Sequence, residues 1–125
     1  MKAEELIEQY KAGERSFDGA FLAGVSLRGV DLSVIDLKGA NVRWPNLREA
    51  NLTDADLSDA ELYEANLQHA VLHNANLNGA VLWRAEVLGA DLEGANLHHA
   101  KVAFTQLTRA ASLRGATLPN GTVHE

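Results

Sequence analysis

The chain has 125 residues, enough for a single domain, and its formal net charge of −6 disfavours nucleic acid as a ligand. It contains no cysteine, which excludes disulfide bonds and thiolate metal sites. It shows neither a secretory signal nor an apolar run of the roughly 20 residues that span a membrane, so we expect a cytoplasmic protein without membrane association.

The first segment has the periodicity of a helix. Leu6, Ile7 and Tyr10 are spaced to form one apolar stripe, and Gly13 follows as a C-terminal cap. The ends of repeat structures expose apolar core and unpaired strand edges, which must be covered. We therefore expect residues 1–14 to form an N-terminal capping helix.

From residue 15 to 118 the sequence repeats every five residues. Every fifth residue from 17 to 107 is Leu at fifteen of nineteen positions, and the others are Phe17 and three valines. Every fifth residue from 20 to 110 is Ala at fourteen of nineteen positions, and the residue before each Leu is mostly Asn, Asp or another polar type. A period of five fits neither a helix nor a continuous strand.

Each unit thus reads Ala, polar, Leu and two variable residues. Residues two apart on an extended backbone point the same way, so Ala and Leu face inward and the polar residue faces out. The two variable residues must then turn the chain. The second of them is often Gly, Asp or Asn, which tolerate the positive φ of a type II turn. A short straight piece followed by a corner, repeated, makes a coil.

The units "ANLTD", "ADLSD", "ANLNG" and "ADLEG" resemble the pentapeptide-repeat family, whose consensus is A(D/N)LXX. The resemblance covers residues 15–118 and implies an all-β solenoid, a right-handed quadrilateral β-helix with four pentapeptides per coil. Residues twenty apart then stack vertically, and the chain makes about five coils. Stacking would bury a continuous leucine column, so we expect Leu62→Asp, in the middle, to unfold the rod.

The pattern breaks at three places. Bulky Val25, Val30 and Ile35 replace Ala near the predicted capping helix. Pro45 occupies an inward position, where we expect the loss of a ladder N–H and a local bulge or bend. The frame slips by one residue between Ala110 and Ala111.

Residues 119–125 form a short C-terminal tail with a turn signal. The C-terminal end is then either covered by this tail or paired with a second chain. Some proteins of the resembled family dimerise at that end, which makes a homodimer one of the two alternatives.

The stacking interval of twenty gathers five of the seven aromatic residues on one side, here called the aromatic face. It carries the units centred on Leu22, Val42, Leu62, Leu82 and Val102. Its candidate interaction residues are Phe21, Arg43, Trp44, Tyr63, Trp83, Arg84 and Phe104. The interval predicts that Tyr63 and Trp83 are vertical neighbours, and that Phe104 continues the column of Trp44, Glu64 and Arg84.

Two interpretations of the aromatic face stay open. Exposed aromatic residues with Arg are the usual anchors of protein interfaces, which indicates a patch for a protein partner. Alternatively, the aromatic side chains cover turn backbone and stack on one another, as cross-strand pairs do.

The acidic residues Glu49, Asp54, Asp56, Asp59, Glu61 and Glu64 form a second cluster. Some proteins of the resembled family mimic duplex DNA and modulate DNA gyrase, so a DNA-mimicking topoisomerase modulator is the alternative function. Here the acids circle one coil instead of following the length of a face, which favours a solvated belt.

Four histidines occupy outward positions and form two neighbouring pairs, His69 with His73 and His98 with His99. A metal site needs three or four converging ligands, so these pairs do not predict one. No nucleophile, base and orienting group come together, and a convex rod offers no deep pocket. We therefore expect no catalytic residues and no cofactor. The sequence favours a non-catalytic, rigid protein-binding or scaffold module with an unidentified protein partner.

Overall fold

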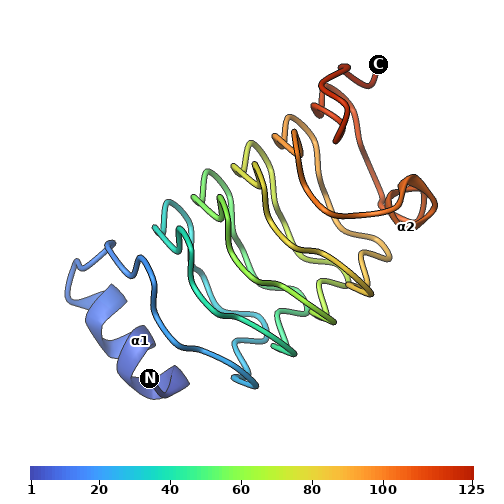
Figure 1. Ribbon diagram of the computed structural model, residues 1–125. Helices are drawn as coiled ribbons and strands as arrows, with labels where there is room; N and C mark the ends of the chain where they lie inside the picture. Colours follow the sequence, from blue (N-terminus) through green and yellow to red (C-terminus); the bar gives the residue numbers. More distant parts are fainter.

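The computed structural model describes residues 1–125 and shows a rod of stacked four-sided coils (Figure 1). Helix α1 (Ala3–Lys11) lies across the N-terminal end, and helix α2 (Phe104–Leu107) projects from the side near the other end. Neither helix has the length and apolar character that a membrane crossing requires. Both chain termini lie at the ends of the rod, so the chain climbs it once from end to end.

The sides of the coils are joined by single-residue parallel bridges instead of long strands. From Ser16–Asp36 to Val81–Lys101, every bridged pair is 20 residues apart. Four sides of five residues therefore close one coil, and the predicted quadrilateral β-helix with a short N-terminal helix is confirmed.

The corners adopt the backbone conformation that the sequence predicts. The second variable residue has positive φ in nearly every unit, and ten of these residues are not glycine. Apart from the corner before Pro45, the corners of the regular coils are closed by a turn hydrogen bond, such as that from Ala60 N to Leu57 O at 3.1 Å. Val34 and Trp44, with φ of 63° and 53°, are bulky residues held in a region that disfavours them. Ladder bonds to the next coil stabilise both corners, at 2.9 Å each.

The polar residue before each Leu has a local role. Where it is Asn or Asp, its Oδ1 accepts the N–H of the first variable residue, two positions later, as in the pairs Asp56–Ser58 and Asn76–Asn78 at 3.0 Å. This N–H makes no ladder bond, so the side chain satisfies a donor that the fold leaves free. The preference for Asn and Asp in the repeat follows from this bond.

The inward positions form one core. Thirty-two buried residues, nearly all Leu and Ala, make a single hydrophobic cluster along the rod axis. The middle leucines Leu52, Leu57 and Leu62 are completely buried. Each buried leucine contributes about 1.5–3 kcal/mol by transfer from water, so the core and the backbone ladders together stabilise the rod.

The prediction at Pro45 was wrong. The ladder is intact on both sides, with Trp44 N donating to Tyr63 O and Asn46 N donating to Val25 O, both at 2.9 Å. The bridge Asn46–Asn66 keeps the interval of 20, so there is no bulge. Pro45 stands where other units use the N–H only to close the corner turn. The missing donor therefore costs one turn bond and no ladder bond.

Helix α1 closes the N-terminal end. Leu6 is fully buried in the core cluster, and the Tyr10 hydroxyl donates to Ser33 O at 2.7 Å. The helix ends in a Schellman motif, in which Gly13 N donates to Tyr10 O and Glu14 N donates to Gln9 O, both at 3.0 Å. Gly13, with φ of 102°, is the cap that the sequence predicts.

At the C-terminal end, α2 interrupts the segment predicted as continuous coil. Beyond it the bridges resume at an interval of 21, as in Asp91–Ser112, so the helix takes up the residue by which the sequence frame slips. The tail then folds back through an antiparallel bridge between Thr117 and Val123, and His124 N donates to Ala116 O at 2.8 Å. Pairing with a second chain at this end stays a prediction.

A candidate protein-interaction face

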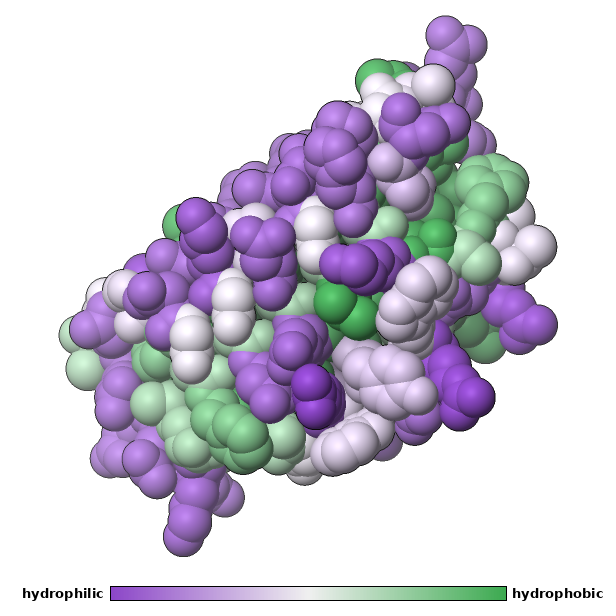
Figure 2. All heavy atoms as spheres, in the orientation of Figure 1, coloured by the Kyte–Doolittle hydropathy of each residue, from purple (hydrophilic) through white to green (hydrophobic).

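The aromatic face is built by vertical stacking of the same side of successive coils. Trp44 N donates to Tyr63 O and Glu64 N donates to Trp83 O, both at 2.9 Å. Tyr63 and Trp83 therefore lie on one wall in neighbouring coils, as the interval of twenty predicts. Figure 2 shows green and pale atoms gathered along this side of the rod between purple margins.

The large apolar side chains of this face are turned to solvent. Trp44 is 56% exposed and Trp83 is 47% exposed, while Tyr63 is half-buried between them. The tryptophan and tyrosine rings make no stacked pairs with one another; the stacked rings of this chain are those of His98 and His99. Mutual stacking therefore does not explain why the aromatic residues gather here.

Two predicted members of the face lie apart from its centre. Phe21 is 63% exposed near the first coil, where its carbonyl accepts the N-terminal amine of Met1 at 2.8 Å. Phe104 does not continue the column of Trp44, Glu64 and Arg84, because it begins helix α2 and the regular coil ends before it. That prediction was wrong, since the interval of twenty does not extend past Lys101.

The arginines of the face are held by acidic residues of neighbouring coils. Arg43 Nε lies 3.3 Å from Glu61 Oε2, and Arg84 Nη1 lies 3.5 Å from Glu64 Oε1. The side chain of Arg84 is nevertheless 75% exposed, so its charge is available to a partner. Arg28 and Arg48 pair with Glu49 in the same way, at 3.2 and 3.6 Å. Part of the acidic belt is thus neutralised within the protein.

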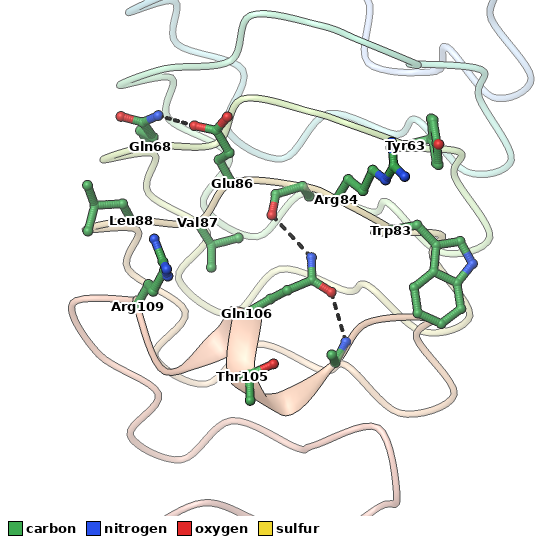
Figure 3. A pocket seen from close by; sticks show the side chains of 12 residues that line it. Tyr63, Gln68, Trp83, Arg84, Glu86, Val87, Leu88, Thr105, Gln106 and Arg109 are labelled. Atoms are coloured by element: carbon green, nitrogen blue, oxygen red, sulfur yellow. Dashed lines mark hydrogen bonds between the residues drawn. The ribbon is translucent and has the colours of Figure 1, made fainter.

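Two hollows border the aromatic side chains. The smaller, of about 310 Å³, lies between Trp44 and Tyr63. The larger, of about 760 Å³, is an open groove between α2 and the coil segment 83–88, here called the α2 groove. Tyr63, Trp83 and Arg84 are labelled near one end of it in Figure 3, and Leu88 and Arg109 near the other.

Gln106 links the two sides of the α2 groove. Its Nε2 donates to Ala85 O at 3.2 Å and its Oε1 accepts Ala103 N–H at 2.9 Å (Figure 3). The same Nε2 also donates to Leu82 O at 3.0 Å. Glu86, at the groove wall, accepts a hydrogen bond from the Gln68 side chain.

Sequence analysis missed the α2 groove with Val87, Leu88, Gln106 and Arg109. Its only signal was the frame slip between Ala110 and Ala111, which shows that one coil holds an extra residue but not what that residue does. It also missed a cluster of His73, Asp91 and Glu93, whose ligand atoms lie within 4.8 Å of one another and could hold a cation. His73 and Glu93 are twenty residues apart, so the stacking interval could have found it.

Comparisons with known proteins agree with this architecture. The family model described as pentapeptide repeats matches residues 15–43, 35–74, 46–84 and 75–111, with 8 copies. No curated protein matches the chain in sequence.

Solved structures also match. HetL, a pentapeptide repeat protein involved in heterocyst differentiation regulation in the cyanobacterium Nostoc, is 31% identical over 87% of this chain, with a TM-score of 0.54. The chain spans only 51% of the length of HetL. A pentapeptide repeat protein of the Arabidopsis thaliana thylakoid lumen is 28% identical over 72% of this chain and 67% of its own, also with a TM-score of 0.54. A second Nostoc protein of this type is 40% identical over 81% of this chain and 75% of its own, with a TM-score of 0.48.

Proposed function

Because the chain belongs to the pentapeptide-repeat family, we propose that it is a rigid, non-catalytic module that binds a protein partner through its aromatic face. The observation that carries the proposal is the placement of Trp44 and Trp83, both about half exposed, on one wall beside Arg43 and Arg84. Trp, Tyr and Arg are the residue types that contribute most to protein interfaces. Large apolar side chains left in solvent cost free energy that a partner would recover.

The backbone under this face supports the same role. Trp44 and Tyr63 stand on coils that ladder bonds of 2.7–3.0 Å join above and below, and the coil of Trp83 is joined in the same way to the coil below it. A surface that is already ordered loses little conformational entropy on binding. The favourable contacts with a partner are therefore offset less, and the affinity is higher.

The alternative function, a mimic of duplex DNA, has weaker support from the acidic cluster that runs from Glu49 to Glu64. Glu49, Glu61 and Glu64 each lie within 3.6 Å of an arginine nitrogen, which reduces the negative potential that such a mimic needs. We therefore expect DNA supercoiling by gyrase to be unaffected by the added protein. Inhibition at stoichiometric amounts would favour the mimic over the present proposal.

Site-specific photo-crosslinking tests the proposed face. A benzophenone amino acid is placed at Trp44 or at Trp83, and as a control at the exposed Lys38 on a different side of the rod. In extract of the native cell, we expect the same discrete adduct from both aromatic positions and none from Lys38. A variant with Trp44, Tyr63 and Trp83 all changed to alanine should lose the partner in affinity capture. Recovery of the same proteins by wild type and triple variant would contradict the proposal.

A further inference from the structure

The backbone ladder of the rod has one gap. From Gly19 to His99, the second variable residue of every unit donates its N–H to the next coil, with the single exception of Arg84. From Phe17 to Leu97, the inward Leu, Val or Phe of every unit does the same, with the single exception of Val87. The two free N–H groups are three residues apart, on the edge of the coil that faces α2.

Helix α2 is the cause of the gap. In the regular pattern, Arg84 and Val87 would donate to the carbonyls of residues nineteen positions later, as Glu64 does to Trp83 at 2.9 Å. Those residues are Ala103, the N-cap of α2, and Gln106, within α2. Their backbone has left the coil, so their carbonyls do not meet the two N–H groups. The carbonyl between the two donors, Ala85 O, is bonded by the Gln106 side chain instead of a backbone N–H.

The gap coincides with the α2 groove. The groove, of about 760 Å³, lies between this edge and α2, and falls in the size range of ligand sites. Its walls combine apolar and cationic side chains: Trp83 and Leu88 are each about half exposed, and Arg84 and Arg109 stand near its two ends (Figure 3). Glu86 also lines the groove and Arg84 lies 3.5 Å from Glu64, whereas Arg109 makes no ion pair and is the cation of the groove that is free to pair with a ligand.

We propose that the α2 groove binds an acidic peptide segment of a partner protein that follows the corner at Arg84, and whose carbonyls accept the N–H groups of Arg84 and Val87. Such a segment adds a piece of strand to an open edge, where main-chain hydrogen bonds give affinity and side-chain contacts give specificity. Carboxylates of the peptide pair with Arg84 and Arg109, and an apolar side chain packs on Trp83 or Leu88. This inference rests on the proposed function and names the class of partner.

A protein segment is favoured over the chain's own tail, because that tail is already paired with its own last coil through Thr117 and Val123. Because the Gln106 side chain is bonded to Ala85 O between the two free donors, a segment that reaches both N–H groups displaces Gln106 from this carbonyl.

The test begins with selection from a phage-displayed library of short random peptides, followed by titration of the selected synthetic peptides into isotope-labelled protein. We expect a consensus rich in Asp and Glu. The amide signals of Arg84 and Val87 should shift and exchange more slowly with solvent on binding, because both N–H groups gain an acceptor. Arg109→Glu should weaken binding by about tenfold or more, through charge reversal next to the peptide.

The matched control is Arg114→Glu, at another exposed arginine that lies outside the groove, which should bind the peptides as wild type does. Trp83→Ala, in the wall of the groove, should weaken peptide affinity. Peptides that leave the Arg84 and Val87 amides unperturbed, or that bind both charge variants equally, would overturn the inference.

The outcomes separate this inference from the proposed function. If crosslinking from Trp44 and Trp83 finds a partner but no acidic peptide is selected, the face binds a folded surface and the peptide groove is wrong. If the groove is instead closed by a second copy, sedimentation will show a concentration-dependent dimer and the same amides protected without any peptide. That result would also overturn the inference.

Discussion

A β-carbon on Gly79 would overlap the carboxylate of Asp59, the residue directly below it in the neighbouring coil. The Asp59 side chain leans up the rod and occupies the space that a side chain at Gly79 would need. The same relation joins His69 to Gly89 and Asn74 to Gly94. At these three corners, a β-carbon would force the side chain beneath it to move, in addition to the strain of positive φ.

Gly79→Ala should destabilise the rod more than Gly39→Ala. Both substitutions force alanine into positive φ, with φ of 71° and 66°, at a cost of about 1–2 kcal/mol. Only Gly79→Ala also meets a side chain, while a β-carbon at Gly39 meets nothing within 4 Å. Urea denaturation should show an additional loss of about 1 kcal/mol for Gly79→Ala. If Asp59→Ala removes the additional loss of stability in Gly79→Ala, the contact with Asp59 is its cause. Equal losses for Gly79→Ala and Gly39→Ala would exclude a role for this contact.

Leu62→Ala should cost about 2–5 kcal/mol in the free energy of unfolding, because it opens a cavity at a completely buried position. Leu88→Ala makes the same chemical change at a leucine that is 49% exposed, and should cost no more than about 0.5 kcal/mol. Thermal unfolding followed by circular dichroism measures both. Leu62→Asp, which buries a charge in the same place, should yield no folded protein; a soluble and folded variant would contradict the account of the core.

Asp56→Ala should remove two hydrogen bonds within one corner. Asp56 Oδ1 accepts the N–H of Ser58 at 3.0 Å and its hydroxyl at 2.6 Å, and neither donor has another acceptor. We expect a loss of about 1–3 kcal/mol, because the Ser58 side chain is buried. Asp56→Asn keeps an acceptor oxygen in place and should retain most of the stability. Similar losses for both variants would show that charge, and not the hydrogen bond, is what matters.

Gln106→Ala should loosen α2 without unfolding the rod. It removes the donor to Leu82 O and Ala85 O and the acceptor of Ala103 N–H. Amide exchange should accelerate at Ala103 and Thr108, whose N–H groups are bonded to Gln106 Oε1 and Phe104 O, and stay unchanged in the middle coils. Gln106→Glu keeps the acceptor but turns the donor into a carboxylate facing two carbonyls, so it should not rescue the helix. Thr105→Ala, at an exposed neighbour in α2, is the control.

The carboxyl of Glu14 should titrate below the ordinary glutamate pKa. The backbone N–H groups of Ser16 and Arg15 donate to its Oε1, both at 2.9 Å, and these bonds lower the pKa of Glu14. A lowered pKa stabilises the folded state above the unfolded pKa, and this contribution is lost as the pH falls through the folded value. Nuclear magnetic resonance titration of the side chain measures the shift. Glu14→Gln should remove this part of the acid sensitivity of the junction between α1 and the first coil.

The fold could be predicted from sequence because its determinants are local and repeated. The five-residue period, the alternation of Ala and Leu, and the residues at the corners each report on the same geometry, and Gly13 marks the end of α1. Pro45 was misread because a period does not show which N–H groups serve the ladder and which only close turns.

The candidate site could be predicted only where the repeat is regular. Tyr63 and Trp83 were placed correctly by counting, since every coil between them has the same length. Phe104 was misplaced, and the groove was missed, because a short helix such as α2 gives no periodic signal. Its sequence, "FTQL", also fits the frame of the repeat, and only the three-dimensional departure of the backbone exposes Arg84 and Val87.

The ladders close again above α2, and this has a consequence for how the protein can be altered. An insertion that leaves one corner and returns to it does not disturb the register of the coils on either side, because each corner is bonded independently to its neighbours. Segment 103–110 is thus a natural grafting point, where longer or foreign loops can be displayed at a fixed height on a stiff support.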